Sequence, residues 1–122
     1  MLYYMLKTRD ELKEYLTNTS KDTVILKFTA IWCGPCKQIA PVILALNQYY
    51  QQKCSNYEYI EIDIDECFDL YAFFKKKKMV NGVPALLSFK KCANPDDFWI
   101  PYQTTTGANI ENVKHFFKKS LE

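Results

Sequence analysis

Residues 28–43 read FTAIWCGPCKQIAPVI, and this stretch determines how the rest of the chain is interpreted. It begins within a nearly continuous apolar and β-branched run, residues 23–30, which predicts a central strand covered on both faces. From Gly34 onward, apolar residues recur at helical spacing, at Ile39, Ile43, Leu46 and Tyr50. A helix should therefore follow the strand, bent by Pro41 within it.

Two cysteines, Cys33 and Cys36, lie three residues apart where the strand passes into the helix. At the start of a helix this spacing places both side chains on one face, with β-carbons about 5–6 Å apart, so that modest adjustment brings them within disulfide reach. A disulfide that closes so short a ring would stabilise the fold by only roughly 2 kcal/mol. Reversible redox chemistry therefore explains the spacing better than a structural role.

The position of Cys33 favours its thiolate. Unpaired amides and the positive end of the helix dipole stabilise an anion there, so Cys33 is the expected nucleophile. Cys36 lies one turn further in and should be more buried. It can attack a mixed disulfide between Cys33 and a substrate, which releases the reduced substrate and closes the Cys33–Cys36 bond.

Length and composition limit the other possibilities. The 122 residues suffice for one domain, 1–122, and 48% hydrophobic with 25% charged residues is typical of a globular protein. A formal charge of +2 gives no reason to expect nucleic acid or a membrane surface as the main partner. No apolar stretch approaches the roughly eighteen residues of a membrane span, and the first residues lack the pattern of a secretory signal. We therefore expect an intracellular, cytoplasmic protein, and we expect it to be a monomer.

The residue types that bind metals do not cluster along the sequence. Only one pair of the five cysteines is closely spaced, whereas a structural zinc site normally needs a second ligand pair. The sole histidine, His115, lies far along the chain on the expected solvent side of a helix, so no metal is expected. Cys54 and Cys67 are interpreted as packing or surface thiols. Cys92 lies in a long connection, where exposure could allow regulatory oxidation.

The rest of the chain alternates strands and helices. The pattern predicts strands over residues 2–6, 57–64, 85–89 and 98–104. A helix opened by the capping residues Thr8 and Glu11 follows the first of these strands. A second helix follows residues 57–64 and has Cys67, Leu70, Tyr71 and Phe74 on its inner face, and a last helix over residues 109–121 has Ile110, Val113, Phe117 and Leu121 inside. This order predicts an α/β fold with a central five-stranded mixed sheet flanked by four helices. Four lysines at 75–78 are explained better as a solvated helix end than as a nuclear-targeting or polyanion-binding run.

On these residues the chain resembles the thioredoxin family. The resemblance runs through FTAIWCGPCKQIAPVI, continues in EIDIDE (61–66) and GVPALLSF (82–89), and closes with Gly107 and the last helix, so it covers essentially the whole chain. It implies the thioredoxin fold and reduction of protein disulfides by dithiol–disulfide exchange at Cys33 and Cys36, with no metal or organic cofactor. It further implies disulfide-bearing client proteins, and a thioredoxin reductase drawing on NADPH as electron donor.

The resemblance also assigns a client groove beside the cysteines. It implies that Pro84 is cis and faces the cysteine pair, and that the backbone of Val83 pairs with an extended client peptide. Trp32 and Gly107 would complete the groove. The residues alone leave plainer alternatives open, with Pro84 an ordinary trans proline at a strand entry and Trp32 a partly exposed packing residue.

One pair of charges departs from the family pattern. Thioredoxins usually carry a buried acid at the place of Lys27 and often a lysine at the place of Glu61, so the two charges are exchanged here. A lysine in a buried strand is costly unless it is paired, so Lys27 should meet Glu61, with Asp63 as a less favoured partner. The pair then either serves Cys36, with Glu61 accepting its proton or Lys27 stabilising its thiolate, or is an inert ion pair.

Two further hypotheses stand beside reduction. The Gly34-Pro35 dipeptide is similar to that of reducing members of the family, which favours reduction as the direction. Within the same chemistry, the alternative is a disulfide donor or isomerase whose reduction potential Lys27 has shifted. A third hypothesis is a binding subunit that keeps the fold, uses the aromatic residues 98–102 as its surface and does not need the cysteines.

Overall fold

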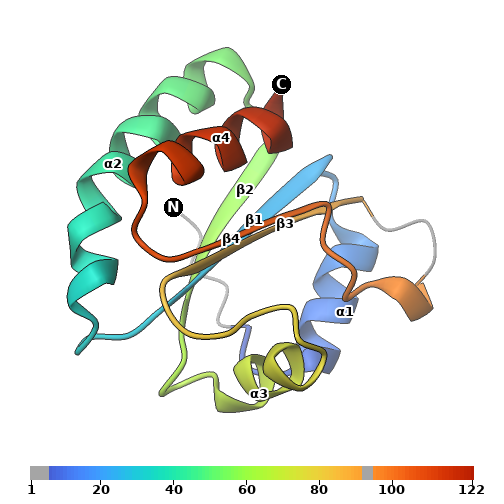
Figure 1. Cartoon of the computed structure of the whole chain (residues 1–122). Coiled ribbons are helices and arrows are strands. Elements are labelled where there is room, and N and C mark those ends of the chain that lie inside the picture. The colour runs from blue at the N-terminus through green and yellow to red at the C-terminus, as the bar shows by residue number, and fades with distance from the viewer. Residues whose placement is uncertain (1–5, 92–94) are drawn as a thin grey trace.

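The computed structural model describes residues 6–91 and 95–122 and shows a sheet between two layers of helices (Figure 1). Along the chain, the elements are α1 (Arg9–Asn18), β1 (Thr23–Thr29), α2 (Gly34–Lys53), β2 (Tyr57–Asp63), α3 (Phe68–Lys76), β3 (Ala85–Lys90), a 3₁₀ helix (Pro95–Asp97), β4 (Gln103–Thr106) and α4 (Ile110–Leu121). Helices α2 and α4 cover one face of the sheet, and α1 and α3 cover the other. The predicted α/β fold class is confirmed.

The sheet is mixed, as predicted. Its order is β2-β1-β3-β4, with β1 parallel to β2 and antiparallel to β3, and with β3 antiparallel to β4. Four strands lie among the described residues. The fifth strand, expected over residues 2–6, falls outside them except for Leu6, which is buried. Because β1 and β2 are parallel, their carboxyl ends meet at the same edge of the sheet, where α2 begins.

Strand β1 is buried on both faces, as its apolar run predicts. Val24, Leu26 and Phe28 belong to the apolar cluster with α1 and α3, and Ile25 belongs to the cluster with α2 and α4. Lys27 follows Ile25 on the same face of the strand. In the described part of the chain, it is the one buried charged side chain.

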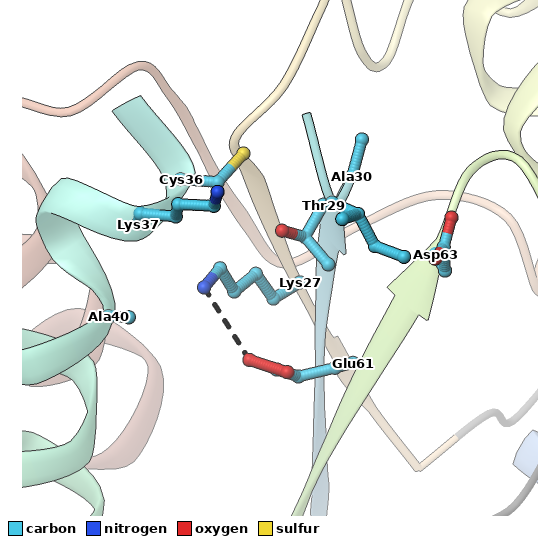
Figure 2. A pocket seen from close by; sticks show the side chains of 9 residues that line it. Lys27, Thr29, Ala30, Cys36, Lys37, Ala40, Glu61 and Asp63 are labelled. Atoms are coloured by element: carbon cyan, nitrogen blue, oxygen red, sulfur yellow. Dashed lines mark hydrogen bonds and ion pairs between the residues drawn. The ribbon is translucent and has the colours of Figure 1, made fainter. Parts of the chain in front are cut away.

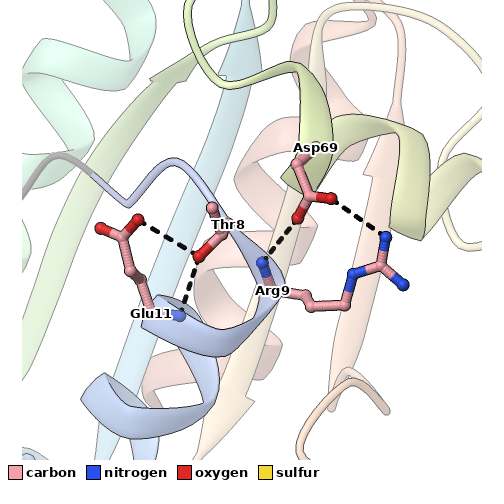
Figure 3. Close-up of polar contacts among 4 residues, drawn as sticks. All are labelled: Thr8, Arg9, Glu11 and Asp69. Atoms are coloured by element: carbon pink, nitrogen blue, oxygen red, sulfur yellow. Dashed lines mark hydrogen bonds and ion pairs between the residues drawn. The ribbon is translucent and has the colours of Figure 1, made fainter.

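Helix α1 begins where the capping pattern predicts. Thr8 is its N-cap, and Oγ1 of Thr8 accepts a hydrogen bond from the Glu11 N–H at 3.2 Å (Figure 3). Arg9 then joins α1 to α3, because its backbone N–H and its guanidinium donate to the two carboxylate oxygens of Asp69, each at 3.0 Å. The hydrogen bond from the guanidinium holds the pKa of the Asp69 carboxyl below its ordinary value.

The connection from β3 to β4 differs from the prediction. A strand was expected over residues 98–104, but β4 begins only at Gln103. Pro95–Asp97 form a 3₁₀ helix, and Phe98 stacks on Phe73 of α3, with ring centroids 5.8 Å apart and an interplanar angle of 8°. Burial of this aromatic ring against α3 takes the place of strand pairing over the first part of the predicted strand.

Two helix faces also differ in detail. Helix α3 begins at Phe68, so Cys67 is its N-cap instead of a member of its inner face, although the Cys67 side chain is buried. In α4, Ile110 is exposed and Phe116 is buried in its place. Helical side chains lean toward the N-terminus, so the side chain of the first residue projects past the contact with the sheet. Helix α2 runs unbroken through Pro41, and the expected bend there stays a prediction.

Candidate active site

A disulfide joins Cys33 to Cys36 where β1 passes into α2. Cys33 is the N-cap of α2, and its sulfur accepts a hydrogen bond from the Cys36 N–H at 3.1 Å. Gly34 and Pro35 open the first turn, where the missing N–H of proline is no loss because first-turn amides have no partner within the helix. The sequence therefore places both sulfurs at the positive end of α2, as predicted.

The two cysteines are almost equally buried in the disulfide form. Cys33 is 3% exposed and Cys36 is 2% exposed, so Cys36 is the more buried of the two, as predicted, but only by a small margin. The sulfur of Cys33 is bonded to that of Cys36, and it lies 3.7 Å from the carbonyl oxygen of Val83.

Two other segments come together beside the Cys33 sulfur. The Val83–Pro84 peptide bond is cis, which confirms the predicted isomer and excludes the trans alternative. Gly107 donates its N–H to the carbonyl oxygen of Pro84 at 2.9 Å and has a φ of +95°, a conformation that glycine adopts without strain. Val83, Pro84 and Gly107 thus gather on one side of the cysteine pair, at the start of β3 and the end of β4.

Trp32, the residue before Cys33, is 66% exposed. Its indole Nε1 donates a hydrogen bond to Oδ2 of Asp65 at 2.9 Å, so the ring is held at the surface and not packed into the core. Asp65 was not identified from the sequence. The parallel pairing of β1 with β2 was the available signal, because it brings together the residues that follow both strands. Ile64 N–H, for example, bonds to the carbonyl oxygen of Thr29 at 3.0 Å.

Lys27 and Glu61 meet in a cavity of about 450 Å³ whose lining includes Cys36 (Figure 2). They are register partners on β1 and β2, and Nζ of Lys27 lies 3.5 Å from Oε1 of Glu61, which confirms the predicted ion pair. The Lys27 side chain is 3% exposed, whereas that of Glu61 is 52% exposed. Asp63, the less favoured partner, lines another part of the cavity, and Lys37 adds a second cation.

A tyrosine joins this ion pair. Tyr59, two residues before Glu61 on β2, donates its hydroxyl hydrogen to Oε1 of Glu61 at 3.1 Å. Burial raises the pKa of Tyr59 far above its ordinary value, so the hydroxyl remains a donor. Tyr59 was not identified from the sequence, although residues two apart on a strand share a face and the spacing from Glu61 was a signal for it.

Cys54 and Cys67 fit a packing role. Cys67 is buried at the N-cap of α3, and burial raises the pKa of its thiol. Cys54 is half-buried at the C-cap of α2, His115 is exposed on α4, and Cys92 lies outside the described residues. Within residues 6–91 and 95–122, no group of three or more His, Cys, Asp or Glu side chains is placed to hold a metal ion. None of the described helices is both long and apolar enough to cross a bilayer.

Comparisons with known proteins agree on one family. The sequence matches the thioredoxin family model over residues 4–112. The thioredoxin of Equus caballus is 32% identical over 113 residues, which cover 93% of each chain. Among solved structures, the thioredoxin of Fasciola hepatica has a TM-score of 0.70 at 23% identity, covering 94% of this chain and 96% of that one. The reduced thioredoxin pre-protein of Schistosoma mansoni has a TM-score of 0.68 at 26% identity, covering 95% of each.

The Cys33–Cys36 disulfide lies at the N-terminus of α2, where it can be reduced and re-formed by exchange with other thiols. The fold and this site define a thiol–disulfide oxidoreductase. The family match and the relatives show that the chain belongs to the thioredoxin family. It is a protein-disulfide reductase of that type. Its redox-active group is the Cys33–Cys36 disulfide, and thioredoxins work without a bound cofactor.

Proposed function

We propose that Cys33 is the attacking cysteine and Cys36 the resolving cysteine. In the reduced protein, the Cys33 thiolate attacks one sulfur of a client disulfide and expels the other client sulfur as a thiolate, which takes up a proton. Cys36 then gives up its proton and attacks the Cys33 sulfur. This step releases the second client sulfur and closes the Cys33–Cys36 disulfide. The client gains two electrons and two protons, and the protein dithiol becomes a disulfide.

The hydrogen bond from the Cys36 N–H to the Cys33 sulfur, at 3.1 Å, is the observation that carries this order. The same amide, together with the positive end of α2, stabilises a negative charge on that sulfur after reduction. Cys36 instead lines the cavity that holds Lys27.

Insulin reduction by single variants tests the order. Cys33→Ser and Cys36→Ser should each lose nearly all turnover, because one cannot attack and the other cannot resolve. Cys54→Ser, which changes a half-buried cysteine outside the pair, is the matched control and should keep full turnover. Turnover that survives either active-site substitution would contradict the proposal.

We propose that the client peptide lies along the side of the disulfide formed by the β3 and β4 segments. The residues assigned to this groove are Trp32, Val83, Pro84 and Gly107, while Gly34 and Pro35 support the active site between the two cysteines. The contact of 3.7 Å between the Val83 carbonyl oxygen and the Cys33 sulfur supports the placement, because a backbone carbonyl there can pair with an extended client. Recognition through backbone groups tolerates many client sequences.

We also propose that the Lys27–Glu61 pair serves Cys36, with Glu61 as the proton acceptor or Lys27 stabilising the thiolate. Their shared cavity supports this role. Lys27→Met and Glu61→Gln should shift the dependence of the reduction rate on pH. Unchanged profiles in both variants would leave the pair as an inert ion pair.

An electron donor is needed to restore the dithiol, and we propose an NADPH-linked thioredoxin reductase, with the protein acting as a cytoplasmic monomer. Support comes from the chemistry, since a protein that reduces disulfides must work where thiols are kept reduced. Coupled oxidation of NADPH in the presence of insulin and a reductase tests this. Insulin reduction that proceeds only with dithiothreitol would contradict it.

A disulfide donor or isomerase is the second candidate function, and the position of Lys27 favours it. A cation in the cavity with Cys36 stabilises the thiolate of the reduced form and so raises the reduction potential. A Cys33–Cys36 potential well above that of the cytosolic glutathione pool would select the donor. A potential below it selects the reductase.

A further inference from the structure

One carboxylate oxygen of Glu61 has two partners. Its Oε1 lies 3.5 Å from Nζ of Lys27 and accepts the hydroxyl hydrogen of Tyr59 at 3.1 Å. The three side chains occupy adjacent positions on one face of β1 and β2, because Glu61 pairs in register with Lys27 and Tyr59 with Ile25. Tyr59 precedes Glu61 along β2, so it reaches the carboxylate from the side remote from Cys36.

The two partners of the ion pair differ sharply in exposure. The Lys27 side chain is 3% exposed, whereas that of Glu61 is 52% exposed. A single contact at 3.5 Å holds a half-exposed, flexible carboxylate only weakly. If that carboxylate turned out to solvent, the buried ammonium of Lys27 would lose its counter-charge, which is costly. The Tyr59 hydroxyl offsets this tendency because it anchors the same oxygen.

We propose that Tyr59 is a positioning residue for the redox reaction: by holding Glu61 against Lys27, it limits how strongly the positive charge of Lys27 acts on the Cys36 sulfur. This inference rests on the proposed role of the Lys27–Glu61 pair. Tyr59 does not line the cavity that Cys36 shares with that pair, so it acts through Glu61.

Other charged groups share this environment. Lys37 of α2 and Asp63 of β2 line the same cavity, and Tyr57 and Glu61 are the titratable groups whose charges act on the Tyr59 hydroxyl. Lys37 and Asp63 are unchanged in all the variants below. A difference between variants therefore reports on Tyr59, Glu61 and Lys27.

Tyr59→Phe is the test, since it removes the hydroxyl and keeps the ring. The released carboxylate compensates Lys27 less, so the Cys36 thiolate and hence the dithiol form become more favourable. We expect the equilibrium constant for reduction of the Cys33–Cys36 disulfide by dithiothreitol to rise about twofold to tenfold in alkaline solution, where Cys36 of the reduced protein is ionised. Dithiothreitol supplies the two electrons and two protons and becomes a cyclic disulfide. The rise should vanish at low pH, where Cys36 is a neutral thiol in both proteins.

Two further variants make the result specific. Tyr57→Phe is the matched control, because Tyr57 lies on the same strand and its hydroxyl bonds to Oδ1 of Asn47 at 2.7 Å, away from Glu61. It should leave the equilibrium and its pH dependence unchanged, even where it lowers stability. In a Lys27→Met background, Tyr59→Phe should have no effect, because the cation that it uncovers is gone.

The outcomes separate this inference from the proposal beneath it. If Lys27→Met alone leaves the equilibrium and its pH dependence unchanged, the role of the ion pair fails and the inference fails with it. If Lys27→Met shifts the equilibrium toward the disulfide but Tyr59→Phe matches Tyr57→Phe, only the role of Tyr59 fails. A shift toward the disulfide in Tyr59→Phe, or an equal shift with and without Lys27, overturns the inference in the same way.

Discussion

The sulfur of Cys33 accepts the backbone amide hydrogen of Cys36, at 3.1 Å. The atom that caps α2, the Cys33 sulfur, is therefore also the atom that takes part in the redox reaction. In most helices the capping atom is a hydroxyl or carboxylate oxygen that undergoes no reaction. Here the capping atom is a reactive sulfur, and after reduction the same Cys36 amide can donate a hydrogen bond to the Cys33 thiolate.

Reduced Cys33 should therefore react at lower pH than a free thiol. The Cys36→Ser variant keeps the backbone amide of residue 36. The pH at which iodoacetamide alkylates Cys33 at half its maximal rate should lie below about 8.5, the ordinary pKa of a cysteine thiol. Mass spectrometry from pH 5 to pH 10 measures the rate, with N-acetylcysteine treated in parallel. A midpoint at or above that of N-acetylcysteine would show that the helix end does not stabilise the thiolate.

Asp65→Ala should weaken binding of protein clients. It removes the acceptor of the Trp32 indole hydrogen bond, so the exposed ring loses its fixed position beside the cysteines. We expect KM for insulin to rise about twofold to tenfold with kcat little changed. The matched control is Glu66→Ala, which changes the next exposed acid and should leave KM unaltered. Equal effects of the two substitutions would argue against a role for the Trp32–Asp65 bond in client binding.

Local patterns predicted the parts of the site that depend on nearby residues. The apolar run of β1, the helical spacing of α2 and the cysteines between them lie within one continuous stretch, and the structure places each as predicted. The Lys27–Glu61 pair was also predictable, because a buried lysine needs a partner and two parallel strands supply one at the same level.

The remaining features depend on contacts between distant segments. The late start of β4 follows from stacking of Phe98 on Phe73, which no strand pattern contains. The pairing of Asp65 with Trp32 required the register of β1 with β2 to be known before the partner could be named.

Lys78→Gly should stabilise the protein. Lys78 follows α3 in the left-handed region, with φ of +62°. Hydrogen bonds from Lys78 N–H to the Lys75 carbonyl at 3.0 Å and from Met79 N–H to the Phe74 carbonyl at 2.9 Å hold it there, in a helix ending where glycine is common. Removing the Cβ should raise the free energy of unfolding by about 1 kcal/mol, measured by urea denaturation.

Lys77→Gly is the matched control for that substitution. Lys77 has φ of −78° and ψ of 0°, so it gains nothing from the freedom of glycine. It also loses the contact of its ammonium with the Trp99 ring, 4.6 Å from the centroid. The free energy of unfolding should fall by roughly 0.5–1 kcal/mol. A gain for both lysines would rule out relief of strain as the cause.

The Arg9–Asp69 contact should make stability depend on pH in the acid range. Arg9 lowers the pKa of Asp69 in the folded state, so the contact stabilises the fold above the unfolded-state pKa. That contribution should be lost as the pH falls through the ordinary value of 3.8 and below. The difference in unfolding free energy between the wild type and Asp69→Asn should therefore be largest near neutrality and shrink between pH 5 and pH 2. A difference that is constant across this range would contradict the assignment.

Mapping a trapped mixed disulfide tests the division of labour between Cys33 and Cys36 most directly. Reduced Cys36→Ser is mixed with insulin, free thiols are blocked, and the non-reduced digest is analysed by mass spectrometry. We predict one client cysteine joined to Cys33, and no adduct when Cys33→Ser is treated in the same way. Clients joined instead to Cys36 in the Cys33→Ser protein, or to Cys54 or Cys67 at comparable yield, would contradict attack by Cys33.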